Sequence, residues 1–300
     1  MPEVGHGERE ADRRVLRALR LALELSAVIF VVEALGAYLS HSLSLTVDAV
    51  HNLPDLIAFG VSWAALRATE SGTSHDYTFG PHRFEVFAGL LNAALILGTG
   101  VAFGYAAVLT LYRSVPFAGA VDPLWLLAAA LPTFGLRAAN LLVMDRLPRR
   151  ARDLNLRSVI LHLASDLAIT GALVFAGIVL YLRPSLGATD ALAALFIASV
   201  LVYESFPLFR EGSEVLSERT PRNLSVEAIT RAALEVPSVA ELHDVHVWAV
   251  CPTLVCMTAH VRVANMSVRE GMSVVAQLRT LMRDEFGILH SVFEVESGPG

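Results

Sequence analysis

The sequence predicts a membrane protein in which an all-α domain of six transmembrane helices precedes a small α+β domain of the ferredoxin-like kind. Of its 300 residues, 54% are hydrophobic and 17% are charged, whereas soluble domains contain about 25% charged residues. Up to residue 207 the apolar residues form runs of about 20, the length that crosses a bilayer core about 30 Å thick. We therefore expect a flexible tail (1–15), a six-span membrane domain (16–207) and a soluble C-terminal domain (208–300).

The six expected spans are joined by short polar connections. They cover residues 16–38, 43–66, 84–112, 124–144, 156–182 and 188–206. Glu33 lies deep in the first span, where an ionisable side chain is expected to face other helices or water. Pro54 interrupts the second span and leaves the carbonyl of Val50 without its helical donor. The polar start of the chain has no apolar segment followed by a cleavage motif, so we expect no removable signal peptide.

The placement of arginine predicts the orientation in the membrane. Cytoplasmic connections are enriched in basic residues, and the basic residues here gather in the tail and in the connection between the fourth and fifth spans. With an even number of spans, both termini are then cytoplasmic, in a multi-pass protein of the cell (inner or plasma) membrane. The arginines concerned are Arg9, Arg13, Arg14, Arg17 and Arg20, and Arg146, Arg149, Arg150 and Arg152.

The C-terminal part reads as helix, strand, strand, helix, strand. Ser225 is placed to cap a helix that runs to residue 234. Residues 242–250 and 255–263 alternate between apolar and polar as strands do. Ser267 opens a second helix that ends near residue 286, and residues 288–295 form a last strand. This order predicts a sheet with both helices on one face.

Two apolar spans carry the same pair of residues, His51 with Asp55 and His162 with Asp166. A spacing of four places both members of a pair on one helical face. A buried carboxylate costs several kcal/mol unless it is paired, and two imidazoles with two carboxylates suit a tetrahedral divalent metal. The alternative is that each polar residue only bonds across helices. Asp48, one turn before His51, could be a fifth ligand, a proton acceptor or a group that orients His51; we favour the last, or a place on the entry path.

These segments resemble those of the cation diffusion facilitator family. The resemblance rests on the stretch 44–55 (SLTVDAVHNLPD), the segment 77–85 (YTFGPHRFE), the pair His162 and Asp166, and the motifs at 242–248 (LHDVHVW) and 287–290 (GILH). It implies a homodimer that exports divalent metal, usually Zn2+, in exchange for protons. Cd2+ and Co2+ are further expected substrates, Mn2+ or Fe2+ an alternative, and no organic cofactor is expected.

Two weaker metal sites are also expected. His75, Asp76 and His82 lie in the loop before the third span, where a solvated loop is the alternative reading. The family often holds a regulatory metal in its cytoplasmic domain, which makes His243, His260 and Glu296 candidates; plain surface histidines are the alternative. Strict strand alternation would place His246 on the face opposite His243.

A histidine must lose its proton to bind metal, so metal and protons compete for one site, which is a physical basis for antiport. An intramembrane zinc hydrolase with Asp48 as general base, and a metal sensor without flux, are the alternatives. We expect a transporter in the lipid bilayer rather than an enzyme. The net charge of −6 is modest, and no nucleic-acid partner is expected.

Overall fold

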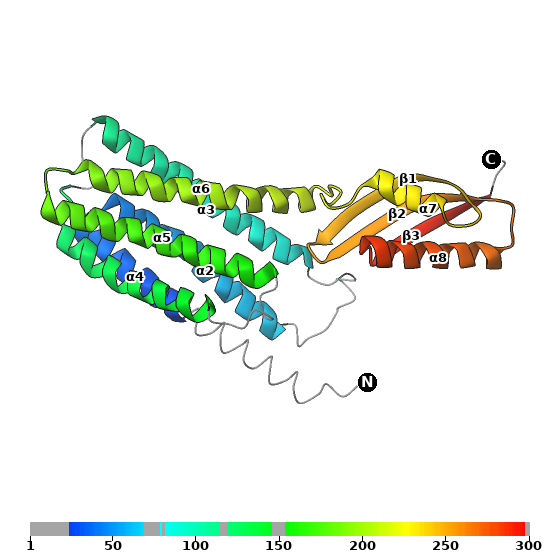
Figure 1. The fold of residues 1–300 in the computed structure, drawn as a ribbon, viewed down its shortest axis with the longest axis horizontal. Helices are drawn as coiled ribbons and strands as arrows, with labels where there is room; N and C mark the ends of the chain where they lie inside the picture. Colours follow the sequence, from blue (N-terminus) through cyan, green and yellow to red (C-terminus); the bar gives the residue numbers. More distant parts are fainter. Residues whose placement is uncertain (1–23, 69–78, 80–81, 114–118, 146–153, 298–300) are drawn as a thin grey trace, which may run out of the picture. The chain divides into compact units, whose positions relative to one another are not determined.

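The computed structural model describes residues 24–68, 79, 82–113, 119–145 and 154–297 (Figure 1). The chain divides into two compact units. The first comprises residues 1–72 and 91–207, and the second comprises residues 73–90 and 208–300. Two long helices, α3 and α6, contribute residues to both units.

The first unit is a bundle of long helices. Residues 24–40 form a helix, and α2 to α6 follow. Four helical segments within the described residues are long and apolar enough to cross a membrane: 82–113, 123–142, 162–182 and 188–216. The helical membrane domain is therefore confirmed, while the number of six crossings stays a prediction. The helices are α2 (Leu43–Ala68), α3 (His82–Arg113), α4 (Pro123–Asp145), α5 (Leu154–Leu182) and α6 (Ala188–Leu216).

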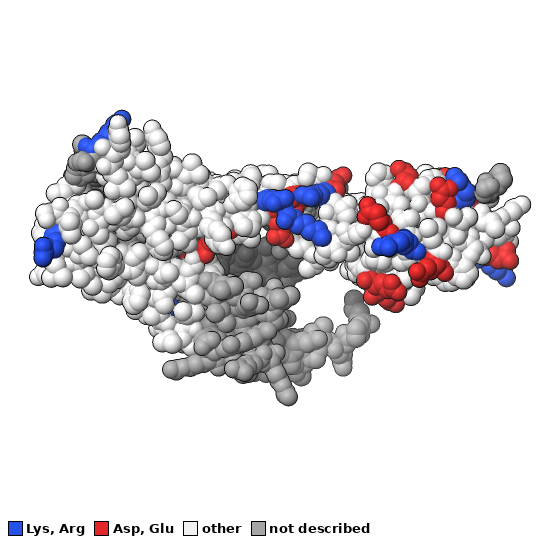
Figure 2. Space-filling view, turned by 45° about the horizontal axis from the view of Figure 1, so that its top comes forward, with Lys and Arg blue, Asp and Glu red and all other residues white. Residues whose placement is uncertain are grey.

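Apolar side chains fill the bundle and also cover its outside. Leu45, Leu126, Leu173 and Ile197 are fully buried, whereas large apolar side chains such as Phe175 are exposed at the surface. Figure 2 shows this part of the visible face almost without charged residues. Extended apolar surface of this kind suits lipid rather than water.

The helix α6 runs ten residues further than the sequence predicted. The predicted sixth span ends near residue 206, whereas the helix that contains it continues through Pro207 to Leu216. Its last turns are polar, and Glu214 there accepts hydrogen bonds from Arg210, Arg219 and Arg222. The change to polar composition therefore marks the end of the apolar part of α6. The polar last turns of the helix are stabilised by the ion pairs of Glu214.

The soluble part of the second unit has the predicted order. It contains α7 (Val226–Leu234), β1 (Val239–Cys251), β2 (Leu254–Val263), α8 (Val268–Phe286) and β3 (His290–Ser297). The sheet order is β1-β2-β3, with β1 and β2 antiparallel and β2 and β3 parallel. The α+β fold class is confirmed.

Both helices of this domain begin where the sequence predicts. The side chain of Ser225 caps α7 by accepting from the N–H of Ala228. Ser267 and Glu270 form a capping box at the start of α8, and Gly287 ends that helix with a positive φ of 68°. Side chains of α7, α8 and one sheet face form a single core that includes Ile229, Leu278 and Met282. Among the described residues, no helix covers the opposite sheet face, where Thr258, His260 and Arg262 are partly exposed.

Candidate metal centres

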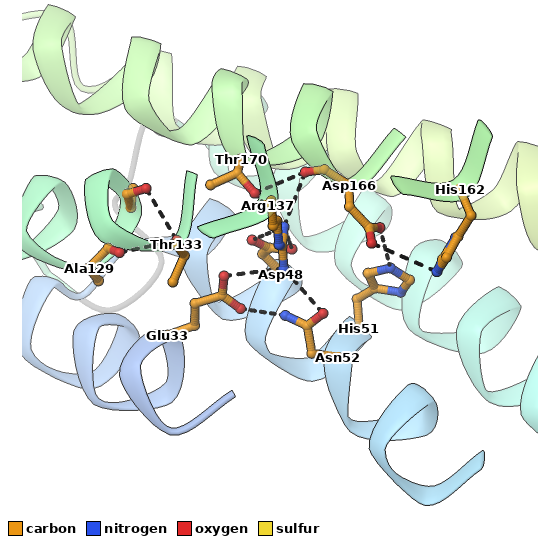
Figure 3. Close-up of polar contacts among 11 residues, drawn as sticks. Glu33, Asp48, His51, Asn52, Ala129, Thr133, Arg137, His162, Asp166 and Thr170 are labelled. Atoms are coloured by element: carbon orange, nitrogen blue, oxygen red, sulfur yellow. Dashed lines mark hydrogen bonds and ion pairs between the residues drawn. The ribbon is translucent and has the colours of Figure 1, made fainter. Parts of the chain in front are cut away.

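The two histidines of the predicted membrane quartet, His51 and His162, converge on the carboxylate of its third member, Asp166 (Figure 3). The Nε2 atom of His51 on α2 lies 3.8 Å from Asp166 Oδ1. The Nε2 atom of His162, one turn earlier on α5, lies 3.7 Å from Asp166 Oδ2. Ligand atoms around a tetrahedral zinc are separated by roughly 3.4 Å, given bonds of about 2.0–2.2 Å. Each imidazole therefore lies at about a ligand–ligand distance from Asp166, although the ligand atoms of the three side chains do not all lie within 4.8 Å of one another.

The fourth predicted ligand, Asp55, belongs to α2, one turn after His51. Its side chain lies outside the described residues. Metal ligation by His51, Asp55, His162 and Asp166 thus stays a prediction, supported by the convergence of the other three.

The convergent groups differ in their access to solvent or lipid. The side chain of His51 is 2% exposed, that of Asp166 14%, and that of His162 47%. Of the three side chains, that of His162, which lies nearest the start of α5, is the most exposed at the surface of the bundle. On the other side of Asp166 the polar groups are buried.

Asp48 does not lie in the open part of the site. Its carboxylate oxygens accept from Nη1 of Arg137 on α4, at 3.3 and 3.2 Å. The guanidinium also lies 3.2 Å from Glu33 of the helix at 24–40 and donates to Asn52 Oδ1 at 3.2 Å. Asn52 in turn donates to Glu33. Glu33 thus faces other helices, as expected.

Arg137 also fixes the backbone next to the metal candidates. It donates to the backbone carbonyl of Asp166 at 3.1 Å and to the hydroxyl of Thr170. The Thr170 hydroxyl bonds the same carbonyl at 2.9 Å. Sequence reasoning assigned Arg137 no role, although an arginine inside a membrane span is itself a signal, because such a charge must be paired.

The loop candidates are only partly visible. His75 and Asp76 lie outside the described residues, and His82 is the first residue of α3. The next residue, Arg83, donates to Glu218 at 2.8 Å.

A second metal centre candidate lies in the soluble domain, where the predicted residues come together. Ligand atoms of His243, His260 and Glu296 all lie within 4.8 Å of one another. His243 Nε2 and His260 Nδ1 each lie 3.0 Å from an oxygen of Glu296. Glu294 and Asp244 lie 3.6 and 3.5 Å from His260 Nε2.

The carboxylates around this cluster favour a protonated histidine. The hydrogen bond to Glu296 raises the pKa of His260, and the charges of Glu294 and Asp244 add to the effect. Hydrogen bonds from His243 and His260 lower the pKa of Glu296. A dication placed among the three side chains would take the place of that proton. Two imidazoles and a carboxylate are a ligand set that zinc accepts.

The sheet register explains how both histidines reach one face. His243 pairs with His260 across the sheet, whereas His246 pairs with Thr258, and the register shifts between them. Asp244 is the extra residue, with a φ of 49°, so β1 has a bulge there. Because His260 and Thr258 share a face, His243 and His246 share it too. The expectation that they lie on opposite faces is wrong.

Comparison with protein families covers both units. The profile of the cation efflux transmembrane domain matches residues 19–217. The profile of the cation efflux protein cytoplasmic domain matches residues 221–297.

Individual relatives match over nearly the whole chain. The metal cation efflux system protein CzcD of Cupriavidus metallidurans is 28% identical over 284 residues, 94% of this chain and 87% of that protein. The cadmium, cobalt and zinc/H(+)-K(+) antiporter of Bacillus velezensis is 27% identical, over 98% of this chain and 92% of the relative. Among solved structures, the metal-bound C-terminal domain of the C. metallidurans CzcD transporter is 27% identical. It covers 24% of this chain and 99% of that domain, with a TM-score of 0.23. Because one family profile spans the helical bundle and its companion spans the soluble domain, the chain belongs to the cation efflux family.

Proposed function

We propose that the protein exports divalent metal cations from the cytoplasm in exchange for protons, with Zn2+ as the main substrate and Cd2+ and Co2+ as further ones. The observation that carries the proposal is the meeting of His51, His162 and Asp166 inside a bundle of membrane helices. The names of the relatives, which include metal efflux and a cadmium, cobalt and zinc/H(+) antiporter, support the same substrates.

The mixture of ligands supports a preference for zinc. Imidazole suits zinc, copper, iron and nickel, whereas sites made only of carboxylates and carbonyls suit magnesium, calcium and manganese. Two histidines with two aspartates form a four-ligand set in which the carboxylates neutralise the dication. Neutral imidazole binds metal and protonated imidazole does not, so acid on the exit side would release the ion.

The direction of export follows from the proposed topology. Arginines in the tail and between α4 and α5 support a topology in which both termini and the soluble domain are cytoplasmic. With that orientation, α5 begins at the cytoplasmic side, and the more exposed His162 lies nearer the cytoplasm than Asp166 does. The described arrangement is then one in which metal enters from the cytoplasm.

The soluble domain would add regulation and assembly. We place a regulatory metal at His243, His260 and Glu296, and we propose a homodimer, because the matched cytoplasmic domain leaves one sheet face open. The partners that we propose for the whole protein are metal ions, protons and lipid, and they do not include nucleic acid.

A hydrolase is a weaker alternative. It needs a general base beside a metal-bound water, and Asp48, the residue that sequence reasoning offered for this role, is bonded to Arg137. We therefore propose transport and no enzymatic activity.

The test is zinc flux in proteoliposomes with an imposed pH gradient. The intact protein is expected to move Zn2+ only when protons can move the other way. Asp166→Ala should lose at least about a hundredfold in rate, since removing even a group that only supports a metal ligand costs 10–100-fold. Ser165→Ala is the matched control on the same helix. Zinc flux in Asp166→Ala equal to that of the control would refute the site.

A further inference from the structure

The side of the metal site opposite His162 is closed by one buried ionic cluster. It consists of Glu33, Asp48, Asn52, Arg137 and Thr170, and we call it the Arg137 cluster. Its side chains come from four helical segments, namely the helix at 24–40, α2, α4 and α5. Figure 3 shows Asp48 and Asn52 of α2 and Glu33 of the helix at 24–40 pointing toward the guanidinium.

Every member of the cluster is shut off from solvent. Glu33, Asp48 and Thr170 are 0% exposed, Arg137 5% and Asn52 8%. A guanidinium buried at membrane depth is unfavourable unless its donors are paired. Here the donors reach two carboxylates, an amide oxygen, a hydroxyl and a backbone carbonyl. Such a cluster is stable when it is dry and all its polar groups are paired, or when water reaches all of them. A partly opened state is unfavourable because some buried polar groups then have no partner.

The cluster lies between the metal site and the end of the bundle at which α2 and α4 begin. Asp48 precedes His51 by one turn on α2, and Thr170 follows Asp166 by one turn on α5. The bond from Arg137 to the Asp166 carbonyl joins the cluster to the site itself, at 3.1 Å. The guanidinium thus stands between the metal site and this end of the bundle (Figure 3).

We propose that Arg137, held by Glu33 and Asp48, is an ionic lock that seals the exit side of the metal site and opens when the metal leaves. The guanidinium acts as an internal cation: it occupies the space between two acids that would otherwise attract the transported ion. The proposal rests on the proposed function for the metal site, for the side on which the ion leaves and for the identity of the ion. The lock itself is a property of the helices.

The test uses a thiol reporter beyond the lock. Ala130 is fully buried and lies two helical turns before Arg137 on α4, toward the same end of the bundle. The full-length protein would carry A130C with both native cysteines, Cys251 and Cys256, replaced by alanine. It is reconstituted in vesicles and treated from either side with a membrane-impermeant cationic thiol reagent, without metal.

The decisive variant is E33Q/R137Q, which removes one charge of each sign and so leaves the net charge of the cluster unchanged. The reporter should then react about tenfold faster or more from the exit side, because a state populated at 0.1–10% becomes a major one. Thr133→Ala is the matched control. Thr133 is also buried on α4, and within the part of the chain that the structure describes its hydroxyl bonds to carbonyls of its own helix, at Ala129 and Ala130. Its reporter should react like that of the parent.

Equal reactivity in the parent and E33Q/R137Q would overturn the lock, and so would an equal rise in Thr133→Ala, because lost packing alone would then explain it. If E33Q/R137Q does not fold, Arg137→Lys decides. Lysine keeps the charge but not the fork of donors, so an increase in labelling supports the lock and no increase rejects it. Zinc flux measured on the same vesicles separates the two proposals. If labelling rises in E33Q/R137Q but the parent shows no zinc flux, transport is refuted and the lock stands. If the parent transports zinc but labelling does not rise in E33Q/R137Q, the lock is refuted and transport stands.

Discussion

Ser44 in the first turn of α2 donates its hydroxyl to Asp190 in the first turn of α6, at 2.5 Å and across 146 residues of sequence. The same carboxylate accepts from the N–H of Leu43 at 2.6 Å and from the hydroxyl of Ser42 at 2.6 Å. The first N–H groups of a helix have no partner inside it, so a residue of α6 supplies the cap of α2. The helix that carries His51 is therefore anchored at one end by another helix.

Replacing Asp190 with alanine should destabilise the bundle by about 2–3 kcal/mol, because a charged cap is lost and buried donors remain. The measurement is the thermal midpoint of the detergent-solubilised protein, which should fall by several degrees. Asp122→Ala is the control, since Asp122 caps α4 through one bond of 2.9 Å to the N–H of Leu124. A smaller loss for Asp190→Ala than for this control would contradict the anchoring role.

Replacing His51 with aspartate should change which metal the site prefers. The site would then hold one imidazole instead of two, and carboxylate ligands favour Mn2+ relative to zinc. We expect zinc transport to fall at least about tenfold, because losing a group that only supports a metal ligand already lowers affinity or activity 10–100-fold, and losing a ligand should lower it further. Uptake of both metals by the same vesicles gives the ratio. An unchanged ratio of manganese to zinc flux would show that His51 is not a ligand.

Zinc binding to the soluble cluster should weaken as the pH falls. In the metal-free protein the pKa of His260 is raised, first by its bond to Glu296. Protonation of His260 therefore stabilises the folded metal-free protein. This contribution is complete below about pH 6.5, the ordinary pKa of histidine, and it is lost as the pH rises through the raised pKa of His260 in the folded state. Zinc must displace that proton, so its affinity should rise with pH across the same window.

Calorimetric titration with zinc between about pH 6 and 8 tests this, in a His51→Ala background that disables the membrane site. His260→Ala should remove the binding. His290→Ala is the control, because His290 is a histidine of the same domain that contacts the ring of Phe79 instead of the cluster. Affinity independent of pH would speak against proton displacement.

Removing the capping hydroxyl with Ser267→Ala should destabilise the soluble domain by about 1 kcal/mol. The bond from the Ser267 side chain also lowers the pKa of Glu270. That contribution is present above the ordinary carboxyl pKa and disappears as the pH falls through the lowered value. Denaturant unfolding at neutral and acid pH should therefore show the difference between Ser267→Ala and the parent shrinking in acid. Ser273→Ala, in the interior of α8, is the comparison.

Most of the fold could be predicted because its signals are local. Length and apolar composition predict the membrane helices, and serines at 225 and 267 mark the starts of α7 and α8. The end of α6 was missed because its last turns are held by contacts between Glu214 and arginines, two of which come after the helix. Hydropathy reports where lipid contact ends and carries no information on such ion pairs.

The candidate sites were predictable to the extent that their residues recur at helical spacing. His51, His162 and Asp166 were found from a repeated motif. The Arg137 cluster draws one or two residues from each of four segments, so no short pattern contains it. The sequence showed a charge in a span, and only the packing of the helices shows which acids pair with it.

The bulge in β1 has a practical meaning for experiments on the soluble cluster. Asp244 is surplus to the hydrogen-bond ladder of the strand. If Asp244 were deleted, the four residues around it would alternate regularly between the two sheet faces, and both imidazoles would stay on the open face. These residues are Leu242, His243, Val245 and His246. The protein thus gains an additional oxygen 3.5 Å from His260 without any change in the placement of its rings. A one-residue deletion there would subtract a single acidic group and spare the rest of the cluster, which few substitutions in a metal centre can do.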